Sequence, residues 1–180
     1  MNGHLATRTH EKMSEVLMNP LAPGPEVHYY MLSGEGKRSN ITIWEPGTVG
    51  GEYIKTYGHY HVGDLHDTYT VLSGSGMVLI QKRFGDTDDV IEHFKAVTVV
   101  AGDILEMPAG YAHVIVNTGN IFLVTADDPH GNGHADYLPV QRMQGFAYYL
   151  VEHNGAPSLM KNARYREVQK SDLGGLSVIE

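Results

Sequence analysis

Cysteine is absent from the 180-residue sequence. Without it the chain can form no disulfide bond, no thiolate metal site and no cysteine nucleophile. A transition metal would therefore need histidine, aspartate or glutamate side chains as its ligands. The sequence contains eleven histidines, so ligands of this kind are plentiful.

Long apolar runs are also missing. No stretch of the sequence approaches the roughly 20 apolar residues that a helix needs to cross a bilayer. Residues 1–25 lack the basic start and the apolar stretch of a secretory signal. We therefore expect a cytoplasmic protein that has no membrane partner.

Positive charge is scarce. The 13 lysines and arginines are outnumbered by 21 aspartates and glutamates, which gives a formal net charge of −8. The basic residues are scattered, whereas a nucleic-acid-binding surface clusters them against the phosphate backbone. We expect no nucleic-acid partner. The length of the chain fits one domain with a substantial core.

Short β-rich runs separated by glycine and proline make up most of the sequence. Side chains alternate in these runs with a period of two, as in residues 77–82. Runs at this spacing predict a β-sandwich or a β-barrel. Before them, residues 11–18 permit a short amphipathic helix that ends ahead of Pro20. The runs cover residues 27–33, 40–45, 51–61, 67–83, 96–108, 112–127 and 146–152.

Two histidines separated by one residue are the first candidate metal ligands. His59 and His61 stand in a β-rich run, and in an extended strand such side chains point to the same side. An isolated pair of this kind more often consists of surface residues that have no function. The metal interpretation therefore depends on a second pattern elsewhere in the chain.

That second pattern is downstream, where glycines and a proline mark a strand, a turn and a second strand. The residue His113 stands near the start of the second strand and can face across the barrel. The pattern consists of Gly102, Pro108, Gly110, His113 and Asn117.

Together the two patterns resemble the motifs of the cupin superfamily, which implies an all-β cupin barrel of the jelly-roll type. The first cupin motif also contains a carboxylate, ordinarily a glutamate, that is separated by six residues from a following glycine. Counting back from Gly74 leads to Asp67, whereas the commonest loop length after His61 leads to His66. Asp67 is favoured as the fourth ligand because it shares strand parity with Tyr69.

Three imidazoles and one carboxylate with open positions suit one divalent metal ion per subunit. Fe(II) is the first expectation, with Mn(II), Ni(II) and Zn(II) as alternatives. Gln81, Tyr69 and Asn117 are candidates for orienting the imidazoles or a bound ligand. Each has an ordinary alternative role, as a barrel-lining or turn residue.

A longer resemblance covers residues 28–165. Residues 46–61, 67–81, 107–119, 133–137 and 146–155 look like the cupin-type phosphoglucose isomerases known from archaea and some bacteria. Residues 46–56 discriminate best, because ordinary cupins have no reason to share them. We expect an N-terminal arm or short helix (1–27), the cupin barrel (28–165) and a C-terminal tail (166–180).

The resemblance implies a glucose-6-phosphate isomerase of glycolysis and gluconeogenesis, with a phosphosugar substrate. The implied metal ligands are His59, His61, Asp67 and His113. The implied phosphate contacts are Thr42, Thr56 and Gly58, and the implied remainder of the sugar pocket is Tyr69, His134 and Tyr137. The candidate catalytic residues are Asp67, His134 and Tyr69, with Asp67 as both ligand and base.

Two neighbouring positions complete the expectations for the phosphate site. Lys55 has the opposite strand parity to Thr56 and is expected to face solvent. Tyr29 and Tyr30 lie where the family has an aromatic residue near the phosphate, and the sequence leaves open which of them points inward.

Two other functions remain open alongside the isomerase. A site of histidines and a carboxylate is also how non-haem iron oxygenases bind substrate and oxygen. A noncatalytic sugar-binding or metal-binding cupin, acting as a sensor, is the third possibility. The extended match around Thr56 and Gly58 favours the isomerase. The open edge of a cupin sheet and the N-terminal arm predict a homodimer.

Overall fold

The structure is a computed structural model that describes residues 4–33 and 40–179. Its strands are β1 (His4–Thr9), β2 (Val27–Ser33), β3 (Asn40–Trp44), β4 (Thr48–Val49), β5 (Glu52–Tyr53), β6 (His59–Gly63), β7 (His66–Ser73), β8 (Ser75–Arg83), β9 (Val90–Val100), β10 (Ile104–Met107), β11 (Ala112–Val116), β12 (Leu123–His130), β13 (Gly133–Asp136), β14 (Tyr148–His153), β15 (Ala156–Lys161), β16 (Glu167–Asp172) and β17 (Val178–Ile179). The helical elements are α1 (His10–Met13), the 3-10 helix η1 (Ser14–Val16) and α2 (Leu138–Arg142). None of the helices in the described ranges is long and apolar enough to span a membrane.

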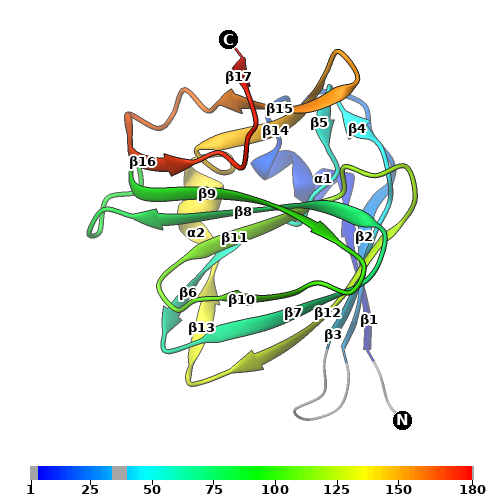
Figure 1. The fold of residues 1–180 in the computed structure, drawn as a ribbon, viewed down its shortest axis with the longest axis horizontal. Coiled ribbons are helices and arrows are strands. Elements are labelled where there is room, and N and C mark those ends of the chain that lie inside the picture. Colours follow the sequence, from blue (N-terminus) through cyan, green and yellow to red (C-terminus); the bar gives the residue numbers. More distant parts are fainter. Residues whose placement is uncertain (1–3, 34–39, 180) are drawn as a thin grey trace.

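Two six-stranded sheets form the barrel (Figure 1). The first has the order β1-β2-β3-β12-β7-β10 and the second has the order β13-β6-β11-β8-β9-β16. A third sheet, in the order β17-β15-β14-β5-β4, includes β14 and β15, which lie above β8 and β9 in the view of Figure 1. The all-β barrel that the sequence predicts is confirmed, and each β-rich run contains at least one strand.

The third sheet explains why β8 is buried on both faces. Met77, Val78 and Leu79 are successive residues of alternating orientation, and each is at most 3% exposed. One face of β8 points into the barrel, and the other points toward β14 of the third sheet. There the ring of Phe94 on β9 packs edge-on against Tyr148, with 4.7 Å between the ring centroids. Alternation alone could not reveal this second buried face.

The N-terminal arm belongs to the barrel. Strand β1 pairs antiparallel with β2 at the edge of the first sheet. After it, Met13, Val16 and Leu17 are at most 1% exposed and join the hydrophobic core. Burying three such side chains stabilises the folded state by roughly 1.5–3 kcal/mol each, which fixes the arm against the body of the protein.

A buried ion pair ends the helical part of the arm. The Lys55 ammonium donates to the carbonyl oxygen of Val16 at 2.6 Å, and the Glu52 carboxylate accepts from the backbone N–H of Met18 at 2.7 Å. The carbonyl of Val16 and the N–H of Met18 are thus bonded to side chains and not to other backbone groups of a helix. The helix that was expected over residues 11–18 accordingly ends at Val16.

The prediction that Lys55 faces solvent is wrong. Its side chain is 5% exposed and lies 2.8 Å from the Glu52 carboxylate, which is itself 1% exposed. Strand parity correctly separates Lys55 from Thr56. The side away from the cavity is nevertheless covered here by the N-terminal arm, so it is not a solvent face.

The C-terminal residues extend two of the sheets. Strand β16 pairs parallel with β9 at the edge of the second sheet, and β17 pairs parallel with β15. The described part of the segment that was expected as a tail therefore consists largely of paired strands.

Candidate metal centre and substrate cavity

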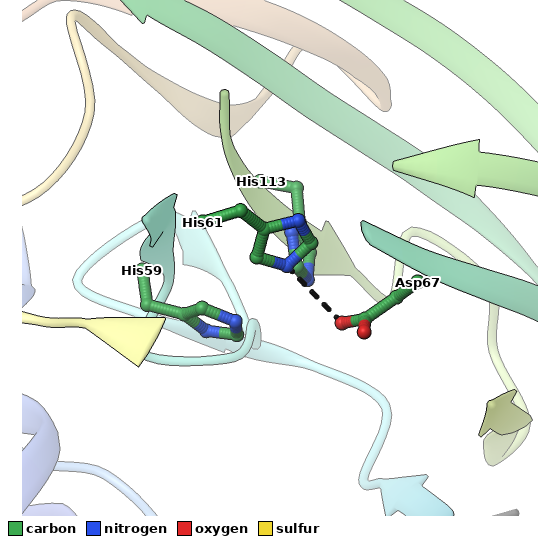
Figure 2. A group of neighbouring side chains, drawn as sticks. All are labelled: His59, His61, Asp67 and His113. Carbon is green, nitrogen blue, oxygen red and sulfur yellow. Dashed lines mark ion pairs between the residues drawn. The ribbon is translucent and has the colours of Figure 1, made fainter. Parts of the chain in front are cut away.

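Three histidines and one aspartate converge inside the barrel (Figure 2). His59 and His61 come from β6, Asp67 from β7 and His113 from β11. The antiparallel register sets His113 directly opposite His59, and directly opposite residues point to the same face of a sheet. Strand pairing thus brings together residues that are more than 50 positions apart in the chain.

The cluster is compact enough for a single metal ion. One ligand atom from each residue lies within 4.8 Å of the others. The closest contact joins the Asp67 carboxylate to Nε2 of His61 at 3.1 Å, drawn as a dashed line in Figure 2. The centroids of the His59 and His113 rings are 4.7 Å apart.

Several polar atoms of the cluster are buried without a hydrogen-bond partner. They are Nδ1 of His61, Oδ1 of Asp67 and Nδ1 of His113. A buried polar atom that lacks a partner costs roughly 1–3 kcal/mol, and a metal ion would satisfy such atoms. Imidazole and carboxylate are also a donor set that suits a divalent transition metal. The residues therefore fit a metal ion.

Burial favours the neutral, metal-binding form of His59 and His113. Burial, reinforced by the neighbouring His61, lowers the pKa of His59 to about 4. Burial also lowers the pKa of His113 well below its ordinary value, and the other two histidines add to this shift. A neutral imidazole keeps a lone pair free for ligation.

Asp67, and not His66, lies with the three histidines. Asp67 is 5% exposed and belongs to the four-residue cluster. His66 is exposed, and its ring packs against that of His130 with 5.4 Å between the centroids. Adjacent strand residues point to opposite faces, so only one of the two can reach the interior.

A cavity of about 280 Å³ opens beside the cluster and is lined by His59, Asp67 and His113. Tyr69 and Tyr137 also line it. The Tyr69 hydroxyl is 3.1 Å from Nε2 of His113, and the ring of Tyr137 lies 5.1 Å from that of His59. Both tyrosines that the sequence placed in the sugar pocket are thus brought to this cavity.

Thr42, Thr56 and Gly58 line the same cavity, and we call these three residues the threonine–glycine wall. The Thr56 hydroxyl accepts the backbone N–H of Ile115 at 3.0 Å, so its own hydrogen remains free to donate. Gly58 has φ +83°, and a Cβ at this position would meet the Phe146 ring at 2.8 Å. Only glycine fits here without displacement.

His134 is not brought to the cavity. It pairs with Val62 of β6, whereas its neighbour Ala135 pairs with His61 and lines the cavity. Strand parity therefore turns the His134 side chain outward, where it is exposed. The prediction that His134 completes the sugar pocket does not agree with this geometry.

Gln81 and Asn117 support the fold instead of the metal cluster. The Gln81 amide donates to the hydroxyls of Tyr60 and Tyr165 and accepts the backbone N–H of Ala147. The Asn117 amide donates to three backbone carbonyls and accepts the N–H of Gly119, which holds a turn. Of the three suggested orienting residues, only Tyr69 contacts an imidazole of the cluster.

Sequence reasoning missed a second buried carboxylate in the cavity. Asp127 on β12 is 9% exposed and accepts a 2.8 Å hydrogen bond from the Asn40 amide. Burial raises the pKa of Asp127 to about 6, and the Asn40 hydrogen bond opposes this rise. Strand parity with Thr125, which faces Thr42 on β3, could have marked Asp127 as inward-facing.

The sequence analysis also left open which of two tyrosines points inward. Tyr29 is 3% exposed and lines the cavity, whereas Tyr30 is only partly buried and does not line it. The Tyr29 hydroxyl accepts the backbone N–H of Tyr57 at 3.2 Å. Tyr29 is thus tied to the segment that carries Thr56 and Gly58.

Solved structures resemble this chain only distantly. A Thermotoga maritima protein described as a predicted oxalate decarboxylase aligns with 20% identity and a TM-score of 0.41, covering 56% of this chain and 78% of that one. The capsular polysaccharide assembling protein CapF of Staphylococcus aureus aligns with 18% identity and a TM-score of 0.43, covering 61% of this chain and 28% of that one.

Sequence comparison gives a more specific result. A family model described as glucose-6-phosphate isomerase matches residues 26–167. The glucose-6-phosphate isomerase of Pyrococcus furiosus is 31% identical over 77% of this chain and 71% of its own length. That of Pyrococcus abyssi is 32% identical over 76% and 71%, and that of Thermococcus kodakarensis is 29% identical over 86% and 82%. The chain belongs to the cupin-type glucose-6-phosphate isomerase family.

Proposed function

We propose that this protein interconverts glucose 6-phosphate and fructose 6-phosphate in the cavity that joins the metal cluster to the threonine–glycine wall. The observation that carries the proposal is the meeting of these two groups of residues in one cavity of about 280 Å³. An aldose to ketose conversion of a phosphosugar needs a polar reacting centre and a separate grip on the phosphate. Both are available here within a chain of the isomerase family.

The threonine–glycine wall would bind the phosphate. The hydroxyls of Thr42 and Thr56 and the backbone N–H of Gly58 are donors of the kind that phosphate oxygens accept. Because Gly58 carries no Cβ, a phosphate oxygen can approach its N–H closely. These contacts hold equally in substrate and product, so they contribute to binding more than to turnover.

The reacting carbons would lie against Asp67 and Tyr69. Isomerisation moves a hydrogen from C2 to C1 and a proton from the C2 oxygen to the C1 oxygen. In the enediol route, the Asp67 carboxylate accepts the C2 proton and returns it to C1. A direct hydride shift from C2 to C1 is the alternative route and requires no protein base. Tyr69, which is 8% exposed, would help to exclude water from this step.

The proposed metal ligands are His59, His61, Asp67 and His113. A bound divalent ion would supply Lewis-acid polarisation of the two oxygens on C1 and C2. Fe(II) is our first choice for the ion, with Mn(II), Ni(II) and Zn(II) as alternatives, because imidazole-rich sites accept all four.

A homodimer in the cytoplasm is the proposed state of the protein. Phosphorylated sugars are confined inside cells by their charge, which supports the compartment. The outer face of the first sheet supports the dimer, because cross-strand partners there are apolar and exposed. Leu5 and Leu32 pair directly and are 58% and 41% exposed, and Ile104 on the far strand is 69% exposed. Light scattering during gel filtration tests this state.

The decisive test of the proposed activity is a coupled assay of fructose 6-phosphate turnover. Metal-stripped protein is measured alone and after addition of Fe(II), Mn(II), Ni(II) or Zn(II). We expect no turnover without metal and recovery with at least one ion. Absence of isomerisation with every ion, in folded protein that binds metal at this site, would contradict the proposal and favour an oxygenase or a sensor.

A further inference from the structure

We propose that Arg8, on the first strand of the N-terminal arm, binds the substrate's phosphate and gives the cavity its preference for phosphorylated over unphosphorylated sugars. This inference rests on the proposed function, because it names a further residue of the same site. The substrate class that Arg8 recognises is a phosphomonoester dianion.

Strand register directs Arg8 toward the cavity. In the pairing of β1 with β2, Arg8 lies directly opposite Tyr29, and opposite residues share a face of the sheet. The Tyr29 side chain points inward and is 3% exposed. Arg8 lines the cavity as well, so its guanidinium approaches from the same side as the Tyr29 phenol.

Tyr29 connects Arg8 to the threonine–glycine wall. Its hydroxyl accepts the N–H of Tyr57, which lies between Thr56 and Gly58 in the chain. The Arg8 charge also bears on both phenols. Burial raises the pKa of Tyr29, and the charge of Arg8 opposes that rise. Arg8 has the same effect on Tyr57. Arg8 also lines the same cavity as the residues proposed to hold the phosphate.

The charge balance of the cavity calls for such a group. Arg8 is the sole lysine or arginine among the described residues that line the cavity. The carboxyl groups of Asp67 and Asp127 line it too, and negative charge repels a phosphate dianion. A divalent ion in the metal cluster would offset the charge of Asp67 at the reacting end, but the threonine–glycine wall carries no positive charge of its own. A guanidinium supplies one, and its planar fork matches the geometry of phosphate oxygens.

Arg8 also has a donor available. Its Nε is buried and has no hydrogen-bond partner among the described residues. A buried donor left unpaired is unfavourable, and a bound phosphate would satisfy it. This is the same signature that marks the metal cluster as a ligand site.

The arm that carries Arg8 is held in place by polar contacts around Tyr57. The Tyr57 hydroxyl donates to the Glu15 carboxylate at 2.6 Å, and Lys12 forms an ion pair with Glu15 at 2.7 Å. Thr9 caps the helix that follows Arg8 by accepting the N–H of Lys12 at 3.3 Å. Arg8 is thus part of a fixed structure and not of a free terminus.

The first experiment compares Arg8→Gln with Arg8→Lys and the parent. KM and kcat are measured for fructose 6-phosphate, with Arg166→Gln as the matched control because Arg166 is exposed and pairs with the surface residue Asp89. We expect Arg8→Gln to raise KM about 10-fold to 100-fold, since a charge-assisted hydrogen bond contributes roughly 1.5–3 kcal/mol. Arg8→Lys should recover part of the loss, and Arg166→Gln should match the parent.

The second experiment needs no catalytic activity. Calorimetric titration of inorganic phosphate into the full-length protein, with equal metal content in parent and variants, reports the phosphate site directly. We expect weaker phosphate binding in Arg8→Gln by a similar factor, with an unchanged melting temperature. An equal loss of affinity for fructose, which has no phosphate, would overturn the inference, because it would show a purely structural role.

The two experiments separate the inference from the proposed function. If the parent turns over fructose 6-phosphate and Arg8→Gln leaves both KM and phosphate affinity unchanged, the inference is overturned and the function stands. If the parent shows no turnover with any metal, the function fails, and the phosphate titration alone decides the role of Arg8.

Discussion

The metal cluster and the threonine–glycine wall line one cavity but are assembled in different ways. The proposed metal ligands come from the paired strands β6 and β11 of the second sheet and from β7 of the first sheet, and strand register fixes their directions. The residues proposed to bind the phosphate come from β3, from the segment before β6 and, by our inference, from Arg8 in the N-terminal arm. The metal cluster therefore depends on the barrel, whereas the phosphate site also depends on how the arm packs against it.

The largest effect that separates the two regions should follow from loss of a metal ligand. His113→Ala removes a buried imidazole of the cluster, and we expect metal affinity to fall by at least about 100-fold, beyond the loss typical for residues that only support a ligand. Turnover should fall with it. Metal content by mass spectrometry, with the exposed His66→Ala as control, measures this. If the control lost the metal and His113→Ala kept it, our assignment of the metal ligands would be wrong.

A smaller but still large effect is expected where the two regions join. Gly58→Ala adds a Cβ that would meet the Phe146 ring at 2.8 Å, at φ +83°. We expect a loss of roughly 1–3 kcal/mol in the free energy of unfolding and a higher KM for the phosphosugar. Gly155→Ala is the control, because Gly155 has φ +80° and open space around it. Equal destabilisation and an unchanged KM would show that backbone strain alone matters at Gly58.

The carboxylate of the cluster can be lengthened without changing its charge. Asp67→Glu restores the residue that cupins ordinarily place there, but Asp67 is 5% exposed and its carboxylate already lies 3.1 Å from His61. An added methylene in such a packed site costs roughly 1–3 kcal/mol. We expect turnover to fall roughly tenfold with KM little changed. Higher turnover in the variant would indicate that the site lost activity when aspartate replaced glutamate at this position.

The smallest effect concerns the contact between arm and barrel. His28 on β2 is fully buried and lies 2.9 Å from the His10 ring of the arm. Burial lowers the pKa of His28 to about 4, and the charges of His10 and Lys55 add to this. The folded state thus binds fewer protons than the unfolded state between pH 6.5 and pH 4, so stability falls as the pH is lowered through this window.

At pH 5.5 this linkage should cost about 1 kcal/mol. We expect His28→Gln to lose less stability than the parent between pH 7 and pH 5.5, measured by urea unfolding at each pH. Parallel pH profiles for parent and variant would mean that another group controls the acid response.

The same contrast explains how far the sequence could predict the site. His59, His61 and His113 were found because short motifs and strand parity are local properties. The direction of His134 depends on which residue of β13 faces His61, and that register is set by pairing between distant strands. Its outward position could not be read from the motif that suggested it.

The sequence also could not show which side chains are buried by segments far away in the chain. The sequence placed Lys55 on the correct face of its strand, but the cover over that face is the N-terminal arm, nearly 40 residues earlier in the chain. Arg8 carried no signal of its own, since a single arginine in an arm resembles any surface charge. The all-β fold was predictable because the β-rich runs and their turns are continuous in sequence.

The central claim is that the metal cluster acts on the reaction and the threonine–glycine wall holds the phosphate. Steady-state kinetics of Asp67→Asn and Thr56→Val in one coupled assay of fructose 6-phosphate tests it most directly. We predict that Asp67→Asn lowers kcat with little change in KM, because the carboxylate acts on the transition state. Thr56→Val should instead raise KM about tenfold with kcat nearly unchanged. If both variants change the same parameter, the division of roles within the cavity is contradicted.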